Sequence, residues 1–240
     1  MRAFALEIPF SNNGKEETIY PAVIQSGSEL LLVDCGYPEF TPLISNALGV
    51  QGFQLCDITS VILTHHDIDH IGALPEIIRQ YPSNKIYAST IEARYINGTE
   101  KMPRLLQAQS LYESLPSQLR PGALAFMQMH EEYPPTEING LLEPGDKIFE
   151  GVEVISTSGH SPGHISLHLP QIKTLIAGDA FIYENGKFGI ANPEYTLDLN
   201  AAYDSISKLS ELDLDRVICY HGGVAEKNVE ELFLSLLKKK

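Results

Sequence analysis

Short apolar runs alternate along this chain with polar turns and with longer amphipathic stretches. The runs at 4–8, 19–25 and 30–33 predict three strands, because aliphatic and β-branched residues recur there over the length of a strand. A helix is expected at 41–48, where Pro42 suits the first helical turn. The runs at 57–63 and 85–88 predict two further strands, separated by a helix at 75–80.

The second half of the chain repeats this order of strands followed by strand and helix units. Strands are expected at 147–149, 152–156, 164–169, 173–177 and 216–220, and helices at 196–209 and 224–237. No low-complexity linker separates the two halves. The pattern therefore predicts an α/β (α+β) fold in which residues 1–240 form a single domain with two similar halves.

Residues 90–136 differ from both halves. Methionines and aromatic residues stand there among prolines and short helical patches, without strand alternation. One interpretation is simple packing of helices onto the domain. The other is an inserted lid or substrate pocket, since methionine and aromatic side chains suit adaptable apolar binding.

The charge balance narrows the classes of partner. Thirty-one acidic residues against seventeen basic ones give a formal net charge of -14, which disfavours a nucleic-acid-binding surface. No apolar stretch approaches the roughly 18 residues of a membrane span. The apolar run at the N-terminus is too short and too interrupted for a signal peptide. We expect a cytoplasmic protein that acts on a small molecule, without a membrane partner.

The densest chemistry lies at residues 64–72, directly after the apolar run at 61–63. Three imidazoles and two carboxylates fall within six positions there: His65, His66, Asp67, Asp69 and His70. The cluster occupies a predicted turn from a strand to a helix that begins at Ile71. Burying so many polar groups without partners is costly, and a metal ion is a suitable partner because imidazole and carboxylate are both good ligands.

Three more polar residues follow apolar runs in the second half. His160 comes after the run at 152–156, Asp179 after 175–178 and His221 after 217–220. Because strand ends meet at the edges of sheets, we expect these residues and the 64–72 turn to converge at one edge.

This ordered set of motifs resembles the metallo-β-lactamase superfamily, in its lactonase and glyoxalase II-like branch, over essentially the whole length. The resemblance implies an αββα sandwich of two mixed sheets flanked by helices, with two divalent metal ions at the edge of the facing sheets. It also implies the ligands: His65, Asp67 and His160 for the first ion, Asp69, His70 and His221 for the second, and Asp179 between them.

Asp67 departs from the resemblance, since the family usually has histidine at this position. We expect Asp67 to be a ligand. Zinc is the expected metal, but a carboxylate hardens the site and also suits manganese or iron.

Five further residues are candidates around this set. Asp34 is expected to hold the ligand loops by hydrogen bonds, and His164 to orient its loop. His66 is expected either to contact the ligands or to face solvent. Tyr183 and Tyr195 could reach the substrate pocket or simply pack.

The expected activity is that of a metal-dependent hydrolase that uses a metal-bridging hydroxide, with Asp69 as the general base. A small ester, lactone or thioester is the expected substrate. Two alternatives stay open: a phosphodiesterase or nuclease with the same site, and a non-catalytic metal-binding sensor.

Overall fold

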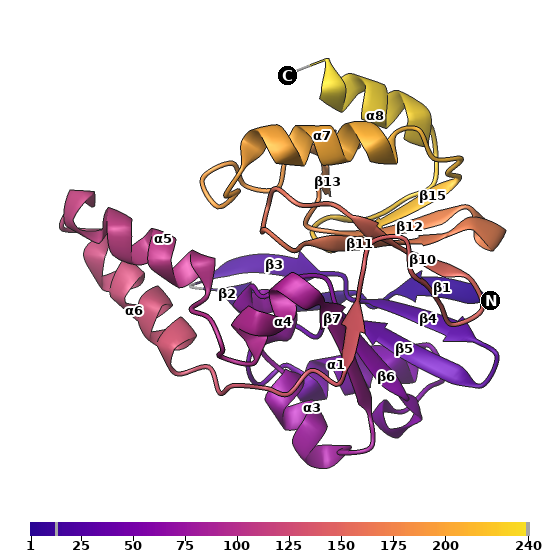
Figure 1. The fold of residues 1–240 in the computed structure, drawn as a ribbon, viewed down its shortest axis with the longest axis horizontal. Coiled ribbons are helices and arrows are strands. Elements are labelled where there is room, and N and C mark those ends of the chain that lie inside the picture. Colours follow the sequence, from indigo (N-terminus) through magenta and orange to yellow (C-terminus); the bar gives the residue numbers. More distant parts are fainter. Residues whose placement is uncertain (13, 239–240) are drawn as a thin grey trace.

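Two facing β-sheets form the centre of the protein, and helices cover their outer faces (Figure 1). The computed structural model describes residues 1–12 and 14–238. The first sheet has the order β1-β4-β5-β6-β7-β8, made of Arg2–Ala5, Ala22–Ser26, Glu29–Val33, Ser60–Leu63, Lys85–Ser89 and Gly140–Leu142. The second has the order β16-β15-β12-β11-β10-β9, made of Gly223–Ala225, Arg216–Cys219, Thr174–Gly178, Ile165–Leu169, Val152–Ser156 and Lys147–Ile148.

The helices lie on the two outer faces and within residues 90–136. Their bounds are Thr41–Val50 (α1), Ile68–Ile71 (α2), Leu74–Gln80 (α3), Thr90–Ile96 (α4), Pro103–Leu111 (α5), Arg120–Glu131 (α6), Leu199–Leu209 (α7) and Val229–Leu237 (α8). Short 3-10 turns occur at Leu55–Asp57, Tyr112–Ser114 and Pro170–Ile172. The predicted αββα sandwich of two mixed sheets is confirmed. None of the helices among the described residues combines the length and the apolar character of a membrane span.

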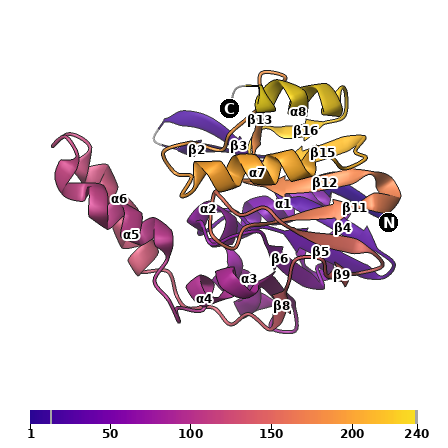
Figure 2. The same cartoon turned by 45° about the horizontal axis from the view of Figure 1, so that its top comes forward.

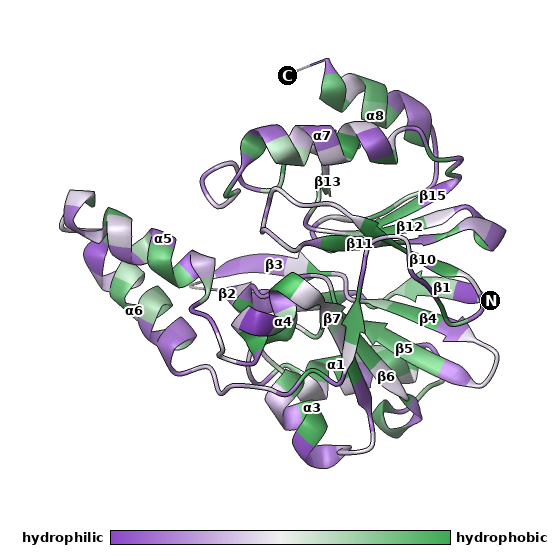
Figure 3. Ribbon diagram, viewed as in Figure 1, coloured by the Kyte–Doolittle hydropathy of each residue, from purple (hydrophilic) through white to green (hydrophobic). Residues whose placement is uncertain are grey.

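The core follows the layers. Ile24, Val33, Leu167 and Ile218 belong to a buried cluster that joins the two sheets. A second cluster packs the first sheet against α1 and α3, and a third packs the second sheet against α7 and α8. Figure 3 shows that apolar residues are concentrated in the strands of the sheets and on the sides of the helices that lie against them. Burial on both faces explains why β12 is almost continuously apolar, whereas β11 buries Ser166 and His168 between its aliphatic residues.

Strand direction brings the chemistry to one edge. β5 pairs in parallel with β6, and β12 pairs in parallel with β15. The carboxyl ends of the strands in each parallel pair therefore lie at the same edge of their sheet, where the polar residues follow them.

Several short elements differ from the expectations. The hairpin β2-β3, at Ile8–Asn12 and Lys15–Ile19, and the hairpin β13-β14, at Ile182–Glu184 and Lys187–Gly189, lie outside the two main sheets. The helix expected from residue 224 begins at Val229, because Gly223–Ala225 instead pairs with β15 as strand β16. The helix expected from Ile71 is preceded by the single turn α2, which carries Asp69 and His70.

Residues 90–136 form α4 and a helical hairpin, α5 and α6, which we call the arm. In both orientations the arm stands away from the sandwich (Figures 1 and 2). Met102 and Met127 are buried in the core cluster of the first sheet, so packing explains these two methionines. Leu106 and Leu124 are about half exposed.

Candidate metal centre

The turn after β6 places its ligands through the short helix α2. Asp67 is the residue before α2, and its extended backbone separates it from Asp69 and His70, which lie within the helical turn. Asp67 therefore approaches one group of side chains while Asp69 and His70 approach another. The turn brings His65 and Asp67 into one of the two groups that the resemblance implies, and Asp69 and His70 into the other.

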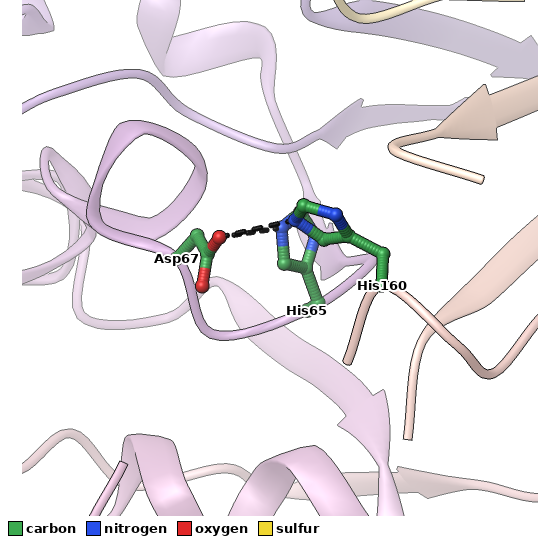
Figure 4. Close-up of side chains that lie close together, drawn as sticks. All are labelled: His65, Asp67 and His160. Carbon is green, nitrogen blue, oxygen red and sulfur yellow. Dashed lines mark hydrogen bonds and ion pairs between the residues drawn. The ribbon is translucent and has the colours of Figure 1, made fainter. Parts of the chain in front are cut away.

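The first ligand group consists of His65, Asp67 and His160, whose side chains point toward one another (Figure 4). His160 Nε2 lies 3.1 Å from Asp67 Oδ2, and His65 Nε2 lies 3.6 Å from the same oxygen. Zinc bonds of about 2.1 Å in a tetrahedral site would separate ligand atoms by about 3.4 Å. The spacing of this group therefore fits a shared ion.

The second ligand group consists of Asp69, His70 and His221. Asp69 Oδ2 lies 3.2 Å from His221 Nε2 and 3.7 Å from His70 Nε2. His221 follows β15, and Tyr220 beside it donates a hydrogen bond from its hydroxyl to the Asp69 carbonyl oxygen. This group has the same ligand spacing as the first.

Asp179 lies between the two groups. Its carboxylate oxygens are 3.7 Å from His160 Nε2, 3.4 Å from His70 Nε2 and 3.5 Å from His221 Nε2. A single carboxylate is thus within reach of both ligand groups. Asp179 occupies the place that the resemblance implies for a bridging ligand.

Orphaned polar atoms test whether the residues fit a metal. Within the described residues, His65 Nε2, His70 Nε2 and Asp179 Oδ1 are buried and have no hydrogen-bond partner. A buried polar atom without a partner is costly, and metal coordination removes that cost. The residues of both groups therefore fit divalent ions.

Asp34 selects the ring nitrogen that each neighbouring histidine presents. Its Oδ2 accepts a hydrogen bond from His70 Nδ1 at 2.9 Å and one from the Thr64 hydroxyl at 2.8 Å. The Thr64 hydroxyl oxygen can then accept from His65 Nδ1, at 3.0 Å. In their neutral forms both histidines therefore present an Nε2 lone pair to the ligand groups. Asp34 thus makes the hydrogen bonds expected of it.

His164 positions the loop that carries Asp179. Its Nε2 accepts a hydrogen bond from the Asp179 backbone N–H at 2.9 Å, and its Nδ1 lies 2.8 Å from the Thr157 hydroxyl. Burial, followed by the nearby His160, lowers the pKa of His164 to about 3. The neutral ring that results can accept the backbone hydrogen bond.

His66 is fully buried, so the alternative that it faces solvent is wrong. Its Nδ1 lies 2.5 Å from Glu92, a buried residue of α4 that the sequence did not single out. Glu92 also accepts hydrogen bonds from the Ser161 hydroxyl and the Gly163 N–H, each at 2.7 Å. Glu92 therefore ties the 65–70 turn to the loop of His160.

Arg104 is the second residue that sequence reasoning missed. It comes from α5, is 2% exposed, and its Nη2 donates to Asp67 Oδ2 at 2.9 Å. Burial alone would raise the pKa of Asp67, but Arg104 and His160 lower it well below its usual value. No periodicity or spacing links Arg104 to Asp67; the unusual feature was only a basic residue among apolar ones.

The second ligand group has no comparable cation among the described residues. Burial alone would lower the pKa of His221, but the carboxylates of Asp179 and Asp69 raise it to about 10. The same two acids, with Asp34, raise the pKa of His70 well above its usual value against the effect of burial. The negative charge of this group therefore attracts either protons or a metal.

The two candidate tyrosines lie on opposite flanks. The Tyr195 ring is 5.6 Å from the Arg104 guanidinium carbon, and its carbonyl oxygen accepts from Arg104 Nη1. The Tyr183 ring packs against Phe188, and its backbone N–H donates to the His221 carbonyl at 3.1 Å. Gly222 permits this approach, because a Cβ there would lie 1.6 Å from the Tyr183 oxygen.

Comparisons with known proteins agree with this arrangement. The profile of the metallo-beta-lactamase superfamily matches residues 18–221. The probable metallo-hydrolase YflN of Bacillus subtilis (strain 168) is 31% identical over 207 residues, which cover 80% of this chain and 75% of that protein. A hydroxyacylglutathione hydrolase of Fuscovulum blasticum is 30% identical over 192 residues, which cover 78% and 55%.

A solved structure shows the same fold. A metallo-beta-lactamase family protein from Thermus thermophilus superposes with a TM-score of 0.73 at 21% identity, over 99% of this chain and 78% of that one. This structure shows the fold, and the profile match and the relative at 31% identity show the family. The protein belongs to the metallo-β-lactamase superfamily and is a metallo-hydrolase of that family.

Proposed function

We propose that the protein is a binuclear hydrolase of small carboxyl esters, lactones or thioesters. The observation that carries this proposal is the meeting of two ligand groups at the single carboxylate of Asp179. Two such groups can hold two divalent ions close enough to act on one substrate bond. Zinc is the proposed metal, and the carboxylate of Asp67 makes manganese and iron the alternatives to test.

Bound divalent ions would supply two effects here: a lower pKa for water and polarisation of the substrate carbonyl. The chain's own contribution centres on Asp69. Its side chain is 20% exposed, whereas that of Asp179 is 8% exposed. Asp69 can therefore orient a water molecule and accept its proton as general base, and then exchange that proton with solvent.

The substrate class follows from charge and from a relative. The formal net charge of -14 disfavours a polyanionic nucleic acid. The Fuscovulum blasticum relative is named for hydrolysis of an acylated glutathione, which is a small molecule. Both considerations favour a small acyl compound over a phosphodiester polymer. Tyr195, at the solvent side of Arg104 and 47% exposed, is proposed to line the substrate entrance.

The test compares Asp69→Asn with Asp213→Asn after removal and return of zinc, manganese or ferrous iron. Asp213 is an exposed carboxylate that pairs with Lys173, so it is a matched control. We expect metal-dependent turnover of one carboxyl class among ester, lactone, thioester and phosphodiester substrates. Asp69→Asn should lower kcat by about 100- to 10,000-fold, the range for loss of a general base, and Asp213→Asn should not.

Two outcomes contradict the proposal in different ways. Metal binding without turnover of any substrate would make the protein a metal-binding sensor. Turnover of phosphodiesters alone would make it a phosphodiesterase with the same site.

A further inference from the structure

Arg104 is a buried cation beside the first ligand group, and it comes from the arm. Its Nη2 lies 2.9 Å from Asp67 Oδ2 and 3.2 Å from His160 Nε2. Its Nε lies 3.2 Å from both oxygens of Asp67. The guanidinium thus contacts two of the three residues of this group.

The remaining nitrogen of Arg104, Nη1, also has its partners within the protein. Nη1 donates to Gln107 Oε1 at 3.0 Å and to the Tyr195 carbonyl oxygen. All three guanidinium nitrogens therefore have partners within the protein. A residue that recognised the anionic group of a substrate would keep donors free for it. Arg104 instead acts inward, on Asp67 and His160.

The contact with His160 uses the atom that a metal would use. A guanidinium can only donate, so this hydrogen bond takes the lone pair of His160 Nε2 in the tautomer that has one there; in the other tautomer Nε2–H donates to Asp67 Oδ2, 3.1 Å away. Coordination of a metal requires that same lone pair. The full positive charge of Arg104 also already neutralises the carboxylate of Asp67. Arg104 and an ion at the first ligand group therefore compete for the same atoms and the same charge.

The second ligand group shows the opposite balance. Asp69 and Asp179 flank His70 and His221, and no lysine or arginine forms an ion pair with either acid among the described residues. A metal ion that arrives there meets two carboxylates that no lysine or arginine neutralises.

We propose that Arg104 is an internal competitor for the first metal position, so that the two positions fill unequally, the second before the first. This inference rests on the ligand sets of the proposed function. Filling the first position requires the guanidinium to release Asp67 and His160. Metal occupancy of this position is thereby linked to the arm that carries Arg104.

The test is a zinc titration followed by calorimetry, with bound zinc counted by elemental analysis. The variants are Arg104→Gln, which removes the charge, and Arg104→Lys, which keeps the charge but loses the planar donor set. Arg94→Gln is the matched control, since Arg94 lies on α4, is exposed and pairs with Glu100. Circular dichroism and thermal unfolding in chelator establish that each variant is folded.

We expect two zinc affinities in the unmodified protein, at least tenfold apart. Arg104→Gln should tighten the weaker one by at least tenfold and leave the tighter one within threefold. Arg104→Lys should give an intermediate change, and Arg94→Gln none.

Unchanged or weaker binding at the first position in a folded Arg104→Gln would overturn the inference and leave the ligand assignment intact. If Arg104→Gln does not fold, Arg104→Lys decides in the same way. Failure of the unmodified protein to bind zinc, manganese or iron would refute the ligand assignment itself, and the proposed function with it.

Discussion

The two ligand groups of this protein have similar spacing but different surroundings. Each contains histidine and aspartate, and both approach Asp179. Arg104 neutralises the first group through Asp67, whereas the second group retains two acids without such a partner among the described residues. The comparison teaches that residue type and spacing place a metal site, while the surrounding charge decides how strongly each position attracts an ion.

The pKa values of the histidines also differ between the two ligand groups. Burial, followed by the neighbouring His70, lowers the pKa of His65 well below its usual value. The acids of the second group instead raise the pKa of His221 to about 10. At neutral pH, His65 presents a free lone pair and His221 carries a proton that a metal must displace. The following predictions test this difference, from the largest effect to the smallest.

Replacing Asp179 should remove the carboxylate that the two ligand groups share. Asp179→Asn removes the charge of the one carboxylate within reach of His160, His70 and His221. We expect metal to be lost from both positions and kcat/KM to fall by at least about 1,000-fold, because both ions contribute to the same chemistry. Elemental analysis and steady-state kinetics measure the two effects.

The matched control is again Asp213→Asn, which should retain metal and activity. Loss of metal from one position alone would show that Asp179 belongs to a single group. The two groups would then have no ligand in common.

Asp34→Asn should affect the second position more than the first. The amide nitrogen cannot accept the hydrogen bond from His70 Nδ1, so the ring loses the partner that fixes its tautomer. We expect affinity at the second position to fall by about 10- to 100-fold. His65 depends on Asp34 only through the Thr64 hydroxyl, which can rotate, so the first position should weaken less.

Zinc titration of Asp34→Asn measures this difference, with Asp57→Asn as control. Asp57 is an exposed carboxylate that accepts a hydrogen bond from the Gln54 N–H, and it is not one of the candidate ligands. Equal losses of zinc affinity at both positions would show that the direct hydrogen bond between Asp34 and His70 matters no more for metal binding than the indirect link between Asp34 and His65.

The two positions should also differ in their response to pH. Because the folded pKa of His221 is about 10, zinc must displace its proton throughout the neutral range. The pKa of His70 is raised as well, so affinity at the second position should rise with pH by about tenfold per unit for each proton displaced. His65 is already neutral, so its contribution to the first position is constant over the same range.

Titrations at pH 6.5 and 7.5, in buffers of different ionisation enthalpy, measure both affinity and proton release. A second position that does not respond to pH would show that its acids do not hold a proton on His221.

The sequence predicted the layers and the convergence of the candidate ligands better than their surroundings. The buried strand β12 is apolar along its length, and the candidate ligands follow short apolar runs, so local pattern was sufficient to place them at strand ends. The hairpin at β3 was missed because Lys15–Ile19 is mostly polar and exposed.

Glu92 and Arg104 could not be predicted for a different reason. Glu92 meets His66 across 26 positions, and Arg104 meets Asp67 across 37. These contacts depend on where the fold places α4 and the first turn of α5 relative to the sheet edge. Residue type at a strand end specifies a ligand, but nothing local specifies which distant side chain will compensate its charge.

The smallest predicted effect concerns the contact that holds the arm near the first group. Tyr195→Ala removes the ring beside Arg104, which also stacks with Phe126 of α6 at 6.3 Å. Such an exposed cation–π contact contributes about 0.5–1 kcal/mol, so Arg104 should be held less firmly by that amount. If Arg104 competes with metal, first-position affinity should rise two- to fivefold and second-position affinity should stay constant. Tyr112→Ala is the control, since Tyr112 makes a similar contact with Arg120 at 5.4 Å, away from the ligands. A weaker first position in Tyr195→Ala would mean that the arm supports the metal site, and the contrast between the two groups would then arise from their acids alone.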